Sequence, residues 1–223
     1  MSTPKFYYGG NGQRDSLGDD KAGTYADQSG HVLHFEDARR SVDQPENFVT
    51  FIAFLTSFSQ AFSSNWNTEE VYGRMDPIAT FKNTTRKISV AWDIPAKSMV
   101  EAEDNLQRCN QLISMLYPTY ARQDDVEPNA LAMSKPPLIR MRYSNLIQGK
   151  DGLGLLGFIN SVNWNPIIEM GYFHTQDKMF PKVIQISVEF QAIHANNLGW
   201  DKDNNSYSGT GTGANHKVNW PFK

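Results

Sequence analysis

The sequence lacks the features that mark several large classes of protein. It holds one cysteine, Cys109, in 223 residues, which excludes an internal disulfide. No apolar run approaches about 18 residues, and no apolar signal segment follows the N-terminus, so we expect neither membrane spanning nor secretion. Its 21 basic and 24 acidic residues give a formal net charge of −3, which supplies no overall attraction for nucleic-acid phosphates. We therefore expect a protein made in the cytoplasm that binds neither membranes nor nucleic acids through bulk charge.

The two ends of the chain are also poor in apolar residues. Residues 1–46 are rich in Gly, Asp, Gln and Ser and residues 201–223 in Asp, Asn, Ser, Gly and Thr, whereas residues 47–200 carry most of the hydrophobic content. We predict an extended N-terminal arm over 1–46, one domain over 47–200 and an extended C-terminal arm over 201–223. Each arm is either disordered or lies on another surface, and its aromatic residues favour the second. We expect a chain without Met1–Gln44 to fold but to attach weakly to its neighbours.

The segment 71–117 gives the clearest structural signal. Within Arg86–Ile94 apolar and polar residues alternate, which predicts a strand with one buried face. Pro95 ends it, and Ser98 with Glu101 three residues later is a capping box that opens a helix. The predicted helix covers 98–117, and its apolar stripe comprises Met99, Ala102, Leu106, Cys109, Ile113 and Leu116. Pro118 follows, so the segment predicts a strand and then a helix.

Further strands are predicted on both sides of this pair. Residues 48–62 are dense in β-forming side chains and read as one long strand, although a helix is the alternative. Asn65–Glu70 is predicted as a loop and Asn83–Thr85 as a break or bulge. The remaining strands are predicted at Ile78–Phe81, Leu138–Tyr143, Leu155–Trp164 and Lys182–His194. One helix among antiparallel strands gives an α+β, mainly β, fold, either a sandwich or a barrel with the helix covering one side.

Patterns that suggest chemistry lack the context they need. Gly152–Gly157 spells G-x-G-x-x-G, but a turn precedes it and a strand follows, whereas a dinucleotide site needs a helix there. Asp201–Asn205 begins like a calcium loop, yet Ser206 and Thr212 occupy the positions of the required glycine and glutamate. His31 and His34 have the i, i+3 spacing of two metal ligands on a helix, but no third ligand lies at a recognised spacing and the surrounding sequence reads as extended. We therefore predict no catalytic, cofactor-binding or metal-binding residues, no cofactor, and a protein that is not an enzyme.

Interface residues are the remaining candidates. Arg140 and Arg142 share one face of a predicted strand and either contact a partner or face solvent. The polar faces of the strands around Ser89 and Ser187 are small and largely uncharged, which suits a lumen or a neighbouring subunit as well as water. The candidate subunit-interface residues are Arg140, Arg142, Trp220, Phe222, Tyr7 and Tyr8.

Several segments carry a resemblance to a known family. The stretches Val71–Phe81 and Thr84–Ala96 resemble the tail-tube initiator proteins of contractile-tailed phages, which sit where the tail tube meets the baseplate. Shorter similarities lie at Pro136–Ile139, Gly157–Asn160, Pro181-Lys182 and Leu198–Asp201. The resemblance covers roughly residues 48–201 and neither arm.

This resemblance implies a tube-type β-barrel with one flanking helix and no catalytic residues. It implies assembly into a homo-hexameric ring in which neighbouring subunits continue each other's sheets, and a location in the virion, in the tail or baseplate. The implied partners are the chain itself, the tail tube protein, the baseplate hub or an adjacent initiator ring, and the tape-measure protein. DNA would be only passing cargo, and membranes would not be involved.

Three readings of function stay open at this stage. The first is a ring-forming tube initiator that templates tube polymerisation, with the tail tube protein itself or another baseplate adaptor as its near alternatives. The second is a carbohydrate- or peptide-binding β-sandwich that uses Trp164, Tyr172 and Phe173 as a platform. The third is an enzyme, which would need a convergent set of titratable residues that the sequence does not show.

Overall fold

The computed structural model describes residues 32–39, 48–52, 54–120, 133–149, 154–175, 177–194 and 198–199. The predicted C-terminal arm and the interface candidates Tyr7, Tyr8, Trp220 and Phe222 lie outside the described residues. The helices and strands are β1 Val32–Asp37, β2 Phe48–Ile52, β3 Phe54–Glu69, β4 Ile78–Pro95, α2 Met99–Ser114, β5 Thr119–Tyr120, β6 Met133–Lys135, β7 Ile139–Tyr143, β8 Leu155–Pro166, the 3-10 helix η2 Ile168–Met170, β9 Tyr172–Thr175, β10 Lys178–Pro181 and β11 Val183–Ala192.

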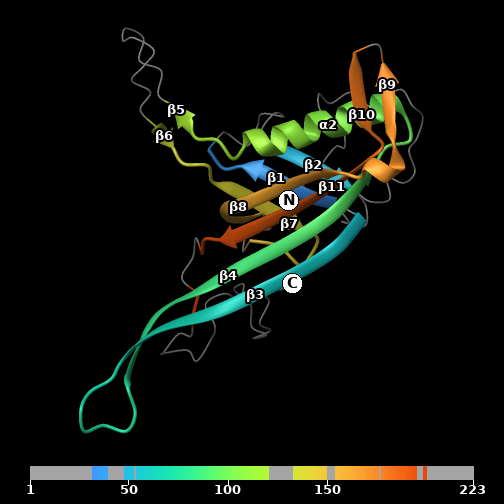
Figure 1. Ribbon diagram of the computed structural model, residues 1–223. Coiled ribbons are helices and arrows are strands. Elements are labelled where there is room, and N and C mark those ends of the chain that lie inside the picture. The colour runs from blue at the N-terminus through green and yellow to red at the C-terminus, as the bar shows by residue number, and fades with distance from the viewer. Residues whose placement is uncertain are drawn as a thin grey trace, which may run out of the picture.

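Seven of these strands form one antiparallel sheet. Its order is β2-β1-β7-β8-β11-β4-β3, and two small hairpins, β9–β10 and β5–β6, stand beside it. The α+β, mainly β prediction is confirmed (Figure 1). The sheet is not a closed barrel, because β2 and β3 are its two outer strands and do not pair with each other. These outer strands are nevertheless successive in the chain, since β2 ends at Ile52 and β3 begins at Phe54.

The core lies on one face of this curved sheet. On β11 and on the part of β4 from Arg86 to Ile94 every second residue is buried, as the alternation in the sequence predicts. The largest fully buried apolar side chains come from five strands and the helix, and the rings of Phe35 and Phe51 both contact Trp92. The buried core residues at its centre are Leu33, Phe35, Phe51, Ile88, Trp92, Leu112, Ile139, Met141, Ile184 and Phe190.

Helix α2 covers the core from the side shown at the top of Figure 1. Ser98 is its N-cap, and the Oγ atom accepts a hydrogen bond from the amide of Glu101 at 3.3 Å. The carboxylate of Glu101 reaches back to the amide of Lys97 at 2.8 Å, one residue before the position that a standard capping box uses. The buried face comprises Ala102, Asn105, Cys109, Leu112 and Met115, so it is rotated slightly from the predicted stripe.

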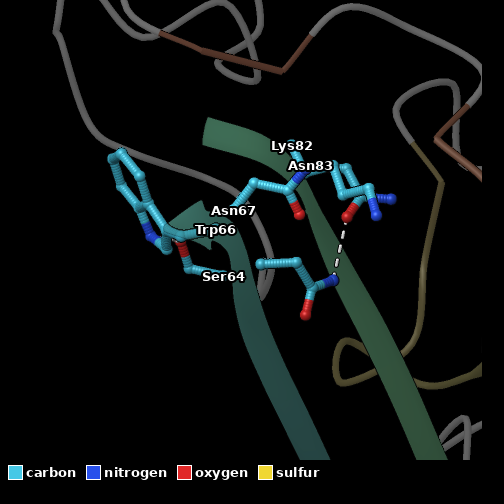
Figure 2. A pocket seen from close by; sticks show the side chains of 6 residues that line it. Ser64, Trp66, Asn67, Lys82 and Asn83 are labelled. Carbon is cyan, nitrogen blue, oxygen red and sulfur yellow. Dashed lines mark hydrogen bonds between the residues drawn. The ribbon is translucent and has the colours of Figure 1, made fainter. Parts of the chain in front are cut away.

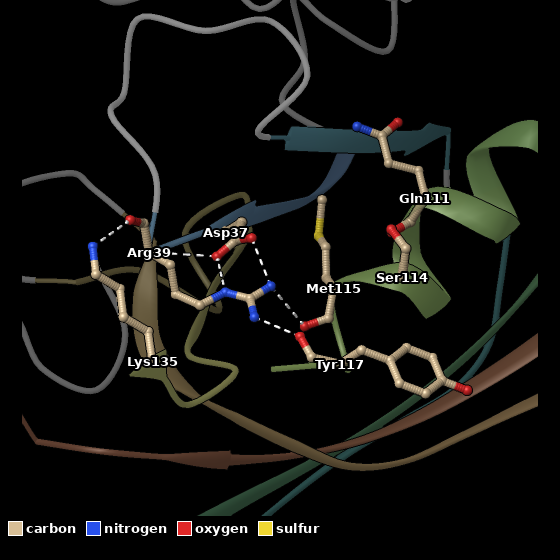
Figure 3. Close-up of polar contacts among 7 residues, drawn as sticks. All are labelled: Asp37, Arg39, Gln111, Ser114, Met115, Tyr117 and Lys135. Atoms are coloured by element: carbon tan, nitrogen blue, oxygen red, sulfur yellow. Dashed lines mark hydrogen bonds and ion pairs between the residues drawn. The ribbon is translucent and has the colours of Figure 1, made fainter. Parts of the chain in front are cut away.

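Arg39, which follows β1, binds the C-terminal end of α2. The last turn of the helix contains no basic residue of its own. The guanidinium of Arg39, just beyond β1, donates hydrogen bonds to the carbonyl oxygens of Met115 and Tyr117 (Figure 3). It also pairs with the carboxylate of Asp37 through two contacts of 2.8 Å. Arg39 therefore supplies the positive charge that a helix C-terminus favours, and it joins β1 to α2.

Three predictions about the first half of the chain are wrong. Residues 48–62 do not form one strand, because they are divided between β2 and β3, which are the two outer strands of the sheet. β1 lies within the range 1–46 assigned to an arm, and it pairs with both β2 and β7. A deletion through Gln44 would remove this strand with its fully buried Leu33 and Phe35, so we no longer expect that deletion to leave the domain folded. Asn65–Glu70 is not a loop either, because β3 continues through Glu69.

Candidate assembly surface

A long two-stranded ribbon projects from the body of the molecule. It comprises Phe62–Glu69 of β3, the connecting residues 70–77, and Ile78–Arg86 of β4 (Figure 1). Strand β11 pairs with β4 from Lys87 to Pro95, so beyond that point β3 and β4 have no strand partner except each other within the described part of the chain. A two-stranded ribbon without a layer packed on it is marginally stable in water. This segment is therefore the part of the described chain most in need of a partner surface.

One face of the ribbon is aromatic. The core-facing side of the sheet continues along it through Phe62, Trp66 and Phe81, which we call the aromatic row. Their exposed fractions are 43%, 55% and 52%, so about half of each side chain contacts solvent. The rings of Trp66 and Phe81 meet edge to face with centroids 5.3 Å apart. The ribbon thus presents an apolar strip that the body does not cover.

A β-bulge keeps this row on one face. Asn65 pairs with Asn83 and Trp66 pairs with Phe81, so Lys82 is an extra residue on β4. Regular pairing would place Lys82 opposite Trp66 and would turn Phe81 to the other face. Beside the bulge lies an open depression lined by Ser64, Asn65, Trp66, Asn67, Lys82 and Asn83, in which the Nδ2 of Asn65 donates to the Oδ1 of Asn83 at 2.8 Å (Figure 2). The bulge lies next to the break predicted at Asn83–Thr85.

The face of β3, β4, β8 and β11 that points away from the core is largely polar. Paired positions across β3, β4, β11 and β8 place small or uncharged side chains side by side, and the Nδ2 of Asn163 donates to the Oγ of Ser187 at 3.2 Å. We call this surface the polar sheet face. Its polar and small residues are Ser57, Ser59, Ala61 and Ser63 on β3, Lys87, Ser89, Ala91 and Asp93 on β4, Gln185, Ser187, Glu189 and Gln191 on β11, and Ser161, Asn163 and Asn165 on β8. Two apolar residues, Phe54 opposite Asp93 and Phe158 opposite Gln191, lie at its margins.

Among the described residues, no strand pairs with the outer edge of β3. Within the described residues β3 pairs only with β4, which leaves one side of a 16-residue strand without a strand partner. Natural edge strands are usually short, or carry lysine, proline or inward charges that prevent pairing with another chain. β3 contains no Lys, Arg or Pro, although a register shift between Leu55 and Ser57 adds one bulge. By contrast, the amide of Gln111 on α2 donates to the carbonyl oxygen of Phe48 at 3.1 Å, so the helix covers part of the β2 edge.

The structure places two of the predicted interface residues. Arg140 lies opposite Glu36 on the neighbouring strand, and its Nη1 atom pairs with that carboxylate at 3.3 Å. Arg142 lies opposite His34 and contributes to the lowered pKa of that imidazole. Both arginines are half-buried on one face of β7, as predicted. They lie on a different strand from the ribbon, and their role at an interface stays a prediction.

The motifs tested for chemistry fall at structural positions. β8 begins at Leu155, so a strand follows the second glycine of the G-x-G-x-x-G pattern, as predicted. A Cβ atom at Gly157 would lie 2.2 Å from the carbonyl oxygen of Gln191, which explains that glycine by close strand packing. Burial raises the pKa of the Cys109 thiol to about 12, so the thiolate is negligible at neutral pH. In the part of the chain that the structure describes, no three His, Cys, Asp or Glu residues gather where they could hold a metal ion.

The aromatic platform considered for sugar or peptide binding is divided. Tyr172 and Phe173 are adjacent on β9, so their side chains point to opposite faces of the β9–β10 hairpin. Phe173 lies opposite the buried Phe180, and the Nζ of Lys182 sits 5.3 Å from the centroid of its ring. Trp164 belongs to β8 and is 40% exposed. These residues therefore do not share one flat surface.

The aromatic row is the feature that the sequence reasoning missed. Phe58, Phe62 and Trp66 recur at every fourth residue, and an even spacing places side chains on one face of a strand. This signal was available in the sequence. Trp66 was missed because the polar run Asn65–Glu70 was interpreted as a loop, and Phe81 because no sequence rule locates the bulge at Lys82.

Comparison with known proteins identifies no family for this chain. No protein-family model matches the chain, and no curated protein matches it. Among solved structures, the tail of an empty GTA particle with C6 symmetry is similar over 73% of this chain and 92% of that chain, with 12% sequence identity and a TM-score of 0.33. A likeness at this level supports no argument about function. In the described residues, no helix is both long enough and apolar enough to cross a membrane.

Proposed function

We propose that this chain is a structural subunit that assembles with copies of itself into a ring, within a phage-type contractile tail. The observation that carries the proposal is the unprotected β3 edge, which continues into a ribbon with an aromatic face. Such an edge is a liability in a monomer, but it allows a neighbouring copy to add a strand and extend the sheet. A ring of identical subunits uses a head-to-tail contact of this kind, because each copy offers one edge and accepts another.

The polar sheet face supports the same proposal. In a ring whose subunits continue one another's sheets, one sheet face lines the channel and the other packs against the helix layer. α2 covers the core side, so the polar sheet face would line the channel. Most of its side chains are uncharged, and Lys87, Asp93 and Glu189 together contribute one positive and two negative charges, a net −1, which suits a conduit through which DNA slides without binding.

The finer proposal is a tail-tube initiator that joins the baseplate hub to the tail tube. It rests on the sequence resemblance at Val71–Phe81 and Thr84–Ala96, which covers the ribbon loop and most of β4. The partners would then be the chain itself, the tail tube protein, the baseplate hub or an adjacent initiator ring, and the tape-measure protein, in the virion. In this role the protein performs no catalysis and needs no cofactor.

Electron microscopy of the purified chain tests this proposal and separates its alternatives. An initiator should form rings that do not elongate alone, whereas a tail tube protein should form long tubes. The variant Ser59→Lys places a charge on the β3 edge and should abolish rings while leaving the fold intact. Gln107→Lys adds the same charge on the exposed side of α2 and should assemble normally. Rings that persist in Ser59→Lys would contradict the proposed edge contact.

A further inference from the structure

A fully buried arginine lies where the ribbon leaves the body. Arg86 is 0% exposed and is the first residue of β4 beyond the part that pairs with β11. It pairs across the ladder with Phe62, the first residue of the ribbon on β3. The side chain of residue 86 therefore lies at the junction between the ribbon and the rest of the sheet.

The guanidinium of Arg86 connects three segments. Its Nε and Nη2 atoms donate to the Oε1 of Gln60 on β3 at 3.1 and 2.7 Å. Nη2 also donates to the carbonyl oxygen of Leu146 at 3.3 Å, and the Nε2 of Gln60 donates to that same oxygen at 3.3 Å. Both strands of the ribbon base are thereby joined to one carbonyl group.

Leu146 belongs to a distant part of the sheet. It lies in the turn after β7, and β8 and β11 separate β7 from β4 in the strand order. The hydrogen bond from Arg86 to Leu146 therefore joins two parts of the molecule that are not neighbours in the strand order. The rings of Phe58 and Tyr143 make a second contact between the same two parts, with centroids 6.3 Å apart.

An aromatic ring closes the arrangement from outside. The guanidinium carbon of Arg86 lies 5.3 Å from the centroid of the Phe62 ring, a distance at which a cation is attracted to the ring face. Burial lowers the pKa of Arg86 to about 10, so the side chain stays charged at neutral pH. Phe62 is the first member of the aromatic row, and Arg86 thus contacts the row directly.

We propose that Arg86 fixes the angle at which the ribbon leaves the body. Burying a charge is costly, and an apolar side chain of similar volume would fill the space without that cost. A planar guanidinium differs from an apolar side chain because its donors have fixed directions, so it orients the groups it binds. Here those groups are the Gln60 amide and the Leu146 carbonyl, which both belong to the body, whereas Arg86 itself is the ribbon residue that they hold. The proposal does not depend on what the ribbon contacts.

Distance measurement between two spin labels tests this role in the full-length chain. Asn67→Cys places one label on the ribbon and Gln107→Cys places the other on the exposed side of α2. Cys109 is buried and its pKa is raised to about 12, so it should not react with the label. The labelled chain is diluted into an excess of unlabelled chain, so that only distances within one copy are measured, and we expect a single narrow distance peak for the parent chain at neutral pH.

Arg86→Met should lose the narrow peak and give a broad distribution, with a cooperative unfolding transition that shows an intact body. Lys87→Met is the matched control, because Lys87 is exposed on the opposite face of β4, and it should keep the narrow peak. Arg86→Lys retains the charge without the planar donors and should also broaden the distribution. A narrow peak in Arg86→Met or Arg86→Lys would overturn the proposal. Failure of both variants to fold would overturn it too, since Arg86 would then be needed for the core.

Discussion

At the scale of single residues, several side chains connect strands that are far apart in the sequence. His34 illustrates this on β1, where it is paired with Thr50 on one side and Arg142 on the other. Its ring contacts that of Phe48, with centroids 5.3 Å apart. Burial, together with the charge of Arg142, lowers the pKa of His34 from 6.5 to about 4. Between pH 6.5 and about 4 the imidazole is therefore mostly neutral in the folded chain and mostly protonated in the unfolded chain.

This depressed pKa predicts that the protein loses stability in weak acid. Between pH 6.5 and about 4 the unfolded chain binds a proton at His34 and the folded chain does not, so falling pH favours unfolding. The loss should reach up to about 3 kcal/mol, and His34→Phe should remove most of that share. Urea unfolding at pH 7.5 and pH 4.5 measures it, with the exposed His174→Phe as control. Equal pH sensitivity in His34→Phe and the parent chain would refute this assignment.

At the scale of elements, the Arg39–Asp37 pair makes α2 depend on β1. Both side chains are nearly buried, with 9% and 5% of their surfaces exposed, and they lie 2.8 Å apart. Lys135 on β6 also donates to the carbonyl oxygen of Arg39 at 3.4 Å, so β6 is joined to the same point (Figure 3). The helix end, β1 and β6 should therefore loosen together when this cluster is broken.

A double-mutant cycle measures that coupling. Arg39→Met leaves the buried Asp37 carboxylate without its guanidinium and should destabilise the chain by about 3–5 kcal/mol. Adding Asp37→Leu removes the stranded charge and should restore about 1–2 kcal/mol. Denaturant unfolding of the two single variants and the double variant gives the coupling energy. If the double variant loses the sum of the single losses, the two residues act independently and the account of this cluster fails.

The elements differ in how far the sequence predicts them. Regular alternation predicts β4, β7 and β11 well, because each buries one face against the core. β1 was missed since its six residues lie in a polar stretch and their burial depends on strands that follow much later. The end of β3 was missed because exposed strands carry the polar residues typical of loops. The capping box predicts the start of α2, but the distant Arg39 at its other end leaves no local signal.

The candidate site is also predicted by the sequence only in part. The alternation predicts the polar residues of β4 and β11, but the sheet order brings them beside those of β3 and β8. Arg140 and Arg142 share a face as predicted, and yet the cross-strand position of Glu36 follows only from the register. The aromatic row depends on one extra residue in β4, and its location is a property of the folded ladder.

At the scale of the whole molecule, the exposed ribbon predicts which contacts hold the assembly together. Trp66→Ser with Phe81→Ser removes the paired rings and should reduce assembly strongly, while the unfolding midpoint changes little because both side chains are half exposed. Tyr117→Ser removes an exposed aromatic at the far end of α2 and serves as the control. Light scattering at equal concentrations compares the three chains. Normal assembly of the double variant would show that the ribbon face is not a contact.

The mass of the purified full-length chain in solution, measured as a function of concentration, tests the central claim most directly. The account predicts a discrete closed assembly in equilibrium with few free subunits, since in the described residues of one copy the β3 edge has no strand partner and the ribbon face is half exposed. The resemblance to tube initiators implies that this assembly holds six copies. A chain that stays monomeric at high concentration, with its fold intact, would contradict it.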